Sequence, residues 1–272
     1  MNSGGRVIPF VKASACGNDF LLMDAALAPP DIHDFTRRIC DRHEGVGADG
    51  IEWMKPHFSA DVEIRLINND GSEAEISGNG TRCVAAFFCA QHGKERIAIL
   101  TGAGVKICSL ISRSDSQYEF EAEMGDAEVG SELVLTVPGA RGQPPQEIRG
   151  IPVSMGNPHF VTFVRDFPAN WQARGAEIQA NPFFTHGVNV EFVSVRDRHN
   201  LAVRFFERGA GETQSSGTGS CASAAAAIAA GRAKSPVKVH APGGIQTVRQ
   251  EGKKVFLRGP ARLVGRGEYF LN

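Results

Sequence analysis

The sequence of 272 residues lacks several features that would point to particular classes of protein. Its 29 Lys and Arg residues nearly balance 30 Asp and Glu residues, so the basic excess typical of proteins that bind nucleic acid or anionic membranes is missing. No apolar run approaches the roughly 20 residues that a membrane-spanning helix needs, and the N-terminus shows no signal-peptide pattern. We therefore expect a cytoplasmic protein that binds neither nucleic acid nor membranes.

The cysteines are few and show no pattern of metal or disulfide chemistry. They form no CxxC pair and no spacing typical of metal ligands, so we expect thiols without a metal site: Cys16, Cys40, Cys83, Cys89, Cys108 and Cys221. No nucleotide or pyridoxal motif is present either, so no cofactor is expected. Abundant glycine and proline, 31 and 14 residues, instead indicate many turns between short strands.

The chain contains an internal repeat. Ser77-Gly78-Asn79-Gly80 recurs as Ser216-Gly217-Thr218-Gly219, at an offset of 139 (216 − 77). Three matches at one offset, close to half of the chain length, predict two homologous halves that join within residues 125–150. The two other matches at this offset are Gly17-Asn18 with Gly156-Asn157, and Asn68 with Glu207.

Each half has the same predicted order of elements. Apolar and β-branched segments predict short strands, then the glycine-rich loop, one helix and further strands. We expect the helices over residues 83–92 and 221–230, each followed by a glycine, Gly93 or Gly231, that suits a C-cap. The second helix is almost all alanine, which favours close enclosure by strands. The pattern predicts two strand-rich shells, each around a central helix.

The glycine-rich loops open the two helices, where backbone N–H groups and the helix dipole favour an anion. Taken singly, Ser77 and Ser216 are ordinary N-caps. Two such loops in register favour paired anion sites, which we expect to face each other across the interface between the halves. Because neither loop matches a phosphate-binding glycine motif, the expected partner is a small amino acid or carboxylate.

The residues alone do not decide the roles of two other polar side chains. His159 follows a strand, and a single histidine is structural more often than catalytic. Glu207 lies between an apolar strand and the second glycine loop, where it fits a salt-bridged strand end as well as a functional carboxylate.

Together these motifs resemble the diaminopimelate epimerase family. They occur in the family's order, and the run Glu-Arg-Gly-Ala-Gly-Glu-Thr at residues 207–213 is the most specific. The other segments are residues 17–20, 45–50, 68–73, 77–83, 155–159, 187–189, 216–219, 242–244 and 259–260.

The resemblance implies an α+β fold of two pseudo-symmetric lobes, each a barrel-like strand shell around a central helix. We expect an N-terminal lobe of residues 1–124, joined by the C-terminal strand 264–272, and a homologous C-terminal lobe of residues 125–263. The implied activity is cofactor-independent, two-base inversion of L,L- to meso-diaminopimelate in lysine biosynthesis. A monomer and a homodimer both remain open.

The resemblance also implies roles for individual residues. His159 and Glu207 would be polar groups near the reacting centre, beside Ser77 and Ser216 at the catalytic positions. The backbone of Gly78, Asn79, Gly217 and Thr218 would hold the substrate α-carboxylate at the helix N-termini. Further substrate contacts would come from Asn18, Asn68, Asn157, Asn189 and Arg208.

The sequence departs from the family at the acid/base positions. Family members use two cysteines, one on each face of the α-carbon, where this chain has Ser77 and Ser216. A hydroxyl is a far weaker acid than a thiol, whose pKa is about 8.5, so a serine needs a neighbouring base. Cys83 and Cys221 lie inside the predicted helices at unequal offsets, and we expect them to pack as small apolar residues.

Three functions are compatible with these residues. The first is a diaminopimelate epimerase-family isomerase that the serines, natural or engineered, make weak or inactive. The second is a thiol-free isomerase of the same fold, in which Glu207 or His159 transfers the proton on another small carboxylate. The third is a non-catalytic amino-acid-binding homologue.

Overall fold

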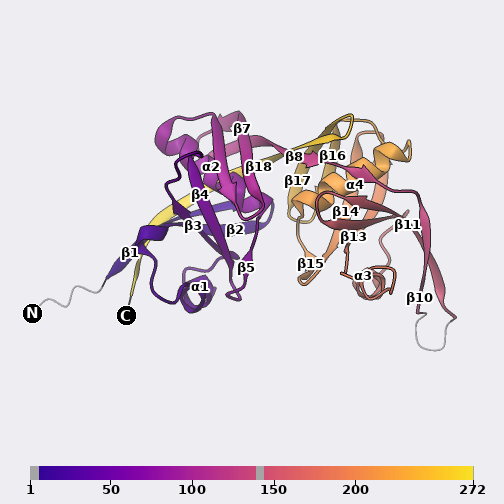
Figure 1. Ribbon diagram of the computed structural model, residues 1–272, viewed down its shortest axis with the longest axis horizontal. Helices are drawn as coiled ribbons and strands as arrows, with labels where there is room; N and C mark the ends of the chain where they lie inside the picture. Colours follow the sequence, from indigo (N-terminus) through magenta and orange to yellow (C-terminus); the bar gives the residue numbers. More distant parts are fainter. Residues whose placement is uncertain (1–5, 139–143, 272) are drawn as a thin grey trace, which may run out of the picture. The chain divides into compact units, whose positions relative to one another are not determined.

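The computed structural model describes residues 6–138 and 144–271, and the chain divides into two compact units (Figure 1). Unit 1 consists of the residues up to Ala122 together with those from Gly259 onward, and unit 2 is Glu123–Arg258. The sequence-based boundaries at residues 124 and 264 lie a few residues further along the chain. Both observed boundaries fall inside long strands, β8 (Gln117–Asp126) and β18 (Lys254–Phe270).

Unit 1 arranges its strands around one long helix, α2 (Gly78–His92). A shorter helix, α1 (Ile32–Cys40), and a 3-10 turn, η1 (Ala25–Leu27), complete it. Strands β2–β3 and β4–β6 pair in parallel, and the other pairs are antiparallel. The strands are β1 (Val7–Ala15), β2 (Asn18–Asp24), β3 (Gly50–Lys55), β4 (Val62–Asn68), β5 (Glu73–Ala74), β6 (Arg96–Thr101), β7 (Gly104–Ser114), most of β8 and the end of β18.

Unit 2 repeats this arrangement around α4 (Gly217–Ala229), with α3 (Trp171–Gln179) in the place of α1. Here β12–β13 and β14–β16 are the parallel pairs. The strands are β9 (Glu128–Val129), β10 (Leu133–Val137), β11 (Gln146–Ser154), β12 (Pro158–Phe163), β13 (Asn189–Asp197), β14 (Asn200–Glu207), β15 (Gly211–Thr213), β16 (Val237–Ala241), β17 (Gly244–Glu251) and the start of β18.

The predicted fold of two strand-rich units with central helices is confirmed. The offset of 139 holds at the level of whole elements, because it converts the bounds of β1 into those of β11 and the bounds of α1 into those of α3. Residues 125–150, predicted as the junction, instead contain β9, β10 and the start of β11, and residues 139–143 of that segment lie outside the described residues.

The two central helices begin earlier than predicted. Ser77 and Ser216 are N-caps, so the glycines that follow them form the first turn of α2 and α4 rather than a loop. At the other end, Gly93 caps α2 in the left-handed conformation (φ 65°), whereas α4 is capped by Ala230. Within the described residues, no helix has the length and apolarity needed to cross a membrane.

The small side chains of α4 let the strands of unit 2 close tightly around it. Ala224–Ala227 are at most 1% exposed and belong to the core cluster of that unit. Interiors are close-packed, so added volume here forces neighbours to move. We expect Ala226→Leu to destabilise the protein by about 1–3 kcal/mol in urea unfolding. Ala229→Leu, at an exposed position of the same helix, should change stability by less than about 0.5 kcal/mol, and equal effects of the two would contradict this packing.

Candidate active site

The first turns of α2 and α4 have the same geometry. Ser77 and Ser216 both have extended backbone conformations, and each hydroxyl oxygen accepts a hydrogen bond from the N–H three residues later, at 3.1 Å. The amides at a helix start point away from the helix and carry the positive end of its dipole. Each unit therefore presents a serine hydroxyl beside backbone groups that favour a carboxylate.

A polar side chain approaches each first turn from the strand that begins nearby. In unit 1, Asn79 Nδ2 donates to Asn18 Oδ1 at 2.7 Å, and Asn18 Nδ2 donates to Asp49 Oδ2 at 3.0 Å. In unit 2, Asn157 Nδ2 lies 3.4 Å from Thr218 Oγ1. These pairs are related by the same offset of 139. The structure thus brings Asn18 and Asn79 together in one unit, and Asn157 and Thr218 in the other.

The serines differ in their partners. Ser216 Oγ donates to Glu207 Oε1 at 2.7 Å, so this hydroxyl has a carboxylate as its hydrogen-bond acceptor. Asn68 occupies the equivalent position in unit 1, and its Nδ2 donates to Ser72 Oγ at 3.0 Å. The described contacts therefore join Glu207 to its serine but do not join Asn68 to Ser77. Of the two capping serines, only Ser216 has a carboxylate as a partner in the described contacts.

His159 belongs to a buried chain of hydrogen bonds. Its Nε2 lies 3.0 Å from Asn157 Oδ1, and its Nδ1 lies 2.7 Å from Glu191 Oε1, with the His159 and Glu191 side chains fully enclosed. With Asn157 accepting, Nε2 carries a proton, and one further proton is shared between Nδ1 and Glu191. Burial raises the pKa of Glu191, and His159 opposes that rise. His159 therefore acts in the structure as the link between Glu191 and Asn157.

Asn189 and Arg208 form a separate link at the end of β14. Asn189 Oδ1 accepts from the Arg208 backbone N–H at 2.9 Å, and its Nδ2 donates to the Pro158 carbonyl at 3.1 Å. The Arg208 guanidinium donates to the His186 carbonyl at 2.7 Å. Both polar atoms of Asn189 are thus engaged with backbone, so in this conformation it positions Arg208 rather than offering its amide to a ligand.

The buried carboxylates Glu52 and Glu191 are missing from the sequence-based set of site residues. Each lies in a strand and packs against the third residue of a central helix, Gly80 or Gly219. The repeat offers the signal that could have found them, since 52 and 191 also differ by 139. Arg82, which lies in the first turns of α2 and is 2% exposed, is a third residue that the patterns did not single out.

The thiols inside the helices are placed as predicted. Cys83 and Cys221 are fully buried in the cores of their units, and burial raises the pKa of Cys83. Neither is positioned as an exposed base. In the described part of the chain, no group of three or more His, Cys, Asp or Glu side chains is arranged to hold a metal ion.

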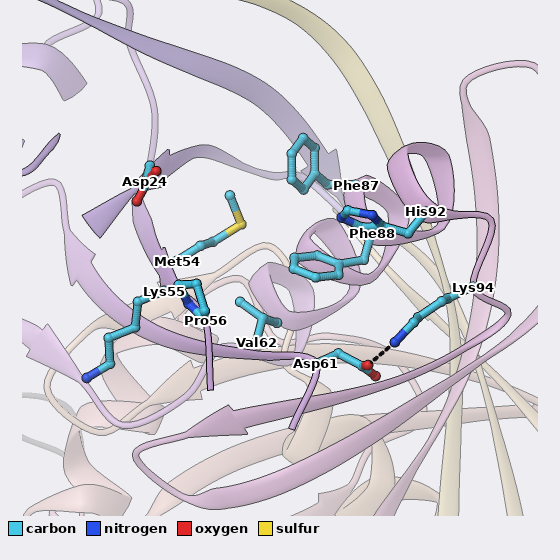
Figure 2. A pocket seen from close by; sticks show the side chains of 10 residues that line it. All are labelled: Asp24, Met54, Lys55, Pro56, Asp61, Val62, Phe87, Phe88, His92 and Lys94. Carbon is cyan, nitrogen blue, oxygen red and sulfur yellow. Dashed lines mark hydrogen bonds and ion pairs between the residues drawn. The ribbon is translucent and has the colours of Figure 1, made fainter. Parts of the chain in front are cut away.

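Two cavities lie near these elements. One of about 490 Å³ is at the C-terminal end of α2, where Figure 2 shows Phe87, Phe88 and His92 opposite the Asp61–Lys94 ion pair. It contains none of the predicted site residues, because Ser77 lies at the other end of this 15-residue helix. Another, of about 530 Å³, lies in unit 2 and is lined in part by Asn157, His159 and Phe183. The second cavity therefore adjoins the predicted residues.

Removing a serine hydroxyl should lower the stability of the protein, because the helix loses its N-cap. We expect Ser77→Ala to lower the free energy of unfolding by about 1 kcal/mol, because the Gly80 N–H loses its acceptor. Ser77→Asn, which keeps an oxygen able to cap, should recover most of this loss in thermal unfolding. Equal stabilities for the alanine and asparagine variants would show that the cap contributes nothing.

Comparison with known proteins identifies the relatives of this chain. The family model for diaminopimelate epimerase matches residues 10–129 and 151–264. A diaminopimelate epimerase from Pelotomaculum thermopropionicum is 40% identical, over 96% of this chain and 98% of the relative. A second, from Desulfitobacterium hafniense, is 37% identical over 94% of this chain and 96% of the relative.

Solved structures share the fold at low sequence identity. A phenazine biosynthesis protein of the PhzF family from Bacillus anthracis aligns over 98% of this chain and all of its own, with a TM-score of 0.71 and 15% identity. A hydroxyproline epimerase from Agrobacterium vitis aligns over 98% of this chain and 92% of its own, with a TM-score of 0.70 and 16% identity. Sequence and fold together place this chain in the diaminopimelate epimerase family, a family of isomerases.

Proposed function

We propose that this chain binds diaminopimelate and carries the two-base site of an epimerase in which Ser77 and Ser216 replace the acid/base cysteines, so that inversion at the α-carbon is weak or absent. The observation that carries the proposal is the 2.7 Å hydrogen bond from Ser216 Oγ to Glu207 Oε1. It places a proton acceptor on the group that would have to act at the α-carbon. The names of the relatives support the substrate.

The chemistry of this pair explains why inversion would be slow. For Ser216 to take the α-proton, its own proton must first pass to Glu207, leaving an alkoxide. A carboxylate is a weak base, with an ordinary pKa near 4.3 for its acid, so the proton stays on the hydroxyl. The pKa of a thiol, about 8.5, lies only about four units above that of the carboxylic acid, so the same proton transfer is far less unfavourable. The pair therefore orients the hydroxyl without generating a strong base.

Substrate binding does not depend on that step. The α2 and α4 N-termini would hold the α-carboxylate through backbone N–H groups, and Asn18, Asn157 and Arg208 would contact the polar groups of the substrate. None of these groups has to change its protonation state. We therefore expect binding to persist where proton transfer fails.

The test combines binding with proton exchange. L,L-diaminopimelate at about 100 times its Kd should stabilise the protein by about 2.7 kcal/mol in thermal unfolding, while L-lysine, which lacks the second carboxylate, should stabilise it much less. In deuterated water the α-proton signal of the bound substrate should decay slowly or not at all. Equal stabilisation by the two amino acids, or none by diaminopimelate, would overturn the proposal.

A thiol-free isomerase is the second candidate, because Glu207 is half-buried beside Ser216 and could itself act as the base on a more acidic C–H bond. It predicts rapid exchange that survives replacement of all six cysteines and is lost in Glu207→Gln. Slow α-proton exchange in the original chain, together with tight binding of diaminopimelate, would contradict this second candidate.

A further inference from the structure

Glu52 is a buried carboxyl for which the proposed reaction has no role. It lies in β3 with no exposed surface, and the residues opposite it on the two neighbouring strands are Leu22 and Leu66. Neither carboxyl oxygen has a hydrogen-bond partner among the described residues. An unpaired buried polar group costs stability, so its presence here calls for an explanation.

The repeat shows what Glu52 lacks. Its equivalent in unit 2, Glu191, is paired with His159 at 2.7 Å. The position equivalent to His159 in unit 1 is Phe20, a buried side chain that offers no hydrogen bond. The same carboxyl therefore occurs in both units, with a basic partner in one and an apolar neighbour in the other.

Glu52 touches the first turn of α2 from inside the core. A methyl group added at Gly80 would come within 1.9 Å of Glu52 Oε1, so the carboxyl lies directly against the backbone of this residue. The Gly80 N–H is the one capped by Ser77. On the other side of this turn, an added methyl at Gly78 would meet only Arg82 Nη1, at 3.9 Å. The outer side of the turn thus has room and a nearby positive charge.

The other charged groups near this turn are engaged elsewhere. Arg82 donates to Asn79 Oδ1 and to the Pro260 carbonyl, and Asp19 is held by Lys12 and Arg42. Cys83, on the side of α2 near Glu52, is a buried thiol with a raised pKa. The neighbouring strands contribute only leucines at this point. Burial therefore acts without opposition and raises the pKa of Glu52 to about 8.

We propose that Glu52 is a positioning residue that couples anion binding at the N-terminus of α2 to its own protonation: the neutral acid leaves this turn open to a carboxylate, and the ionised form repels it. The carboxylate of Glu52 and the bound anion would lie on opposite sides of one helical turn, in a medium that screens charge poorly. Their repulsion should weaken binding on the order of tenfold. The inference rests on the proposed function only in naming an amino-acid carboxylate as the natural anion.

The experiment follows sulfate, whose charge is constant from about pH 6.5 to 9.5, in protein labelled with ¹³C at the glycine α-carbons. Gly78 reports on α2, and Gly217 reports separately on the equivalent turn of α4, so that sulfate binding at the two turns is distinguished. In the original chain the affinity measured at Gly78 should fall on the order of tenfold across pH 8. In Glu52→Gln it should not fall, and Glu63→Gln, a half-buried carboxyl on the neighbouring strand β4 that pairs with Lys55, should behave as the original chain does.

A second measurement keeps the test decisive if Glu52→Gln fails to fold. The ¹³Cδ resonance of Glu52 in the original chain should titrate with the same midpoint as the loss of affinity at Gly78. An identical pH step with and without Glu52, no response of Gly78 to sulfate at any pH, or a Glu52 midpoint below about pH 6 would each overturn the proposal. Because sulfate is the probe, a failure of diaminopimelate to bind would sink the proposed function alone.

Discussion

Replacing both serines by cysteine, Ser77→Cys with Ser216→Cys, should raise the rate of α-proton exchange on L,L-diaminopimelate by about 10²–10⁴. Positioned acid/base groups contribute factors of this size, and a thiol ionises near neutral pH, above all at a helix N-terminus. Both positions begin such helices, and Glu207 already accepts a hydrogen bond from residue 216. The measurement is loss of the α-proton signal in deuterated water, together with the appearance of the meso isomer.

The single variants are the matched controls for this gain. Two-base inversion needs a proton removed on one face and delivered on the other, so neither Ser77→Cys nor Ser216→Cys alone should reach the rate of the double variant. Glu207→Gln in the double-cysteine background should reduce exchange, because residue 216 then loses its proton acceptor. A double variant that binds diaminopimelate but exchanges no faster than the original chain would contradict the assignment of these positions.

Replacing Glu52 by leucine should stabilise the protein, and the gain should increase with pH. The pKa of Glu52 is about 8 in the folded state and near 4.5 in the unfolded chain. Between these values the folded state binds the proton more tightly, so the free energy of unfolding of the original chain falls as pH rises, by up to about 1.4 kcal/mol per pH unit. It levels off above pH 8. Glu52→Leu removes this slope and the unpaired acid, and should be several kcal/mol more stable at pH 9.

The two tryptophans make this measurable unit by unit. Trp53 lies in unit 1 and Trp171 in unit 2, both nearly buried, so a Trp171→Phe background lets urea unfolding of unit 1 be followed by fluorescence. Glu63→Leu, on the neighbouring strand β4, serves as the control and should leave the pH slope unchanged. A gain for Glu52→Leu that is the same at pH 5 and pH 9 would show that Glu52 does not titrate in this range.

Much of the fold could be predicted because the residues that reveal the repeat are serines and glycines, which particular backbone conformations favour. In both halves a capping serine is followed by glycines in the first turn of the central helix, which makes the start of each helix recognisable. Helices α1 and α3 could not be found this way. They share bounds under the offset but not composition, since α3 contains Gly175 and has no side-chain cap. The two helices occupy equivalent positions in the repeat, but they share no sequence pattern that would identify both.

The sequence indicated individual residues of the candidate site but not the hydrogen bonds between them. The sequence places Glu207 and Asn68 at equivalent positions, yet only Glu207 meets its serine. His159 was open between structural and catalytic roles, and its buried bond to Glu191 shows the structural contact that the sequence did not indicate. Buried carboxyls in strands look like the polar half of an alternating pattern, and only the fold reveals that Glu52 faces the core.

The closure of unit 1 has a consequence for how this chain is made. β1 pairs with β2 on one edge and with the end of β18 on the other, where Val7 lies opposite Phe270 and the Leu271 N–H donates to the Arg6 carbonyl at 2.8 Å. All of unit 2 must be synthesised before β18 can pair with β1, whereas unit 2 is continuous and can be complete earlier. Until β18 is made, the edge of β1 that does not pair with β2 is unpaired and open to other chains. A circular permutant that fuses the adjoining ends would shorten that interval to the time needed for one hairpin.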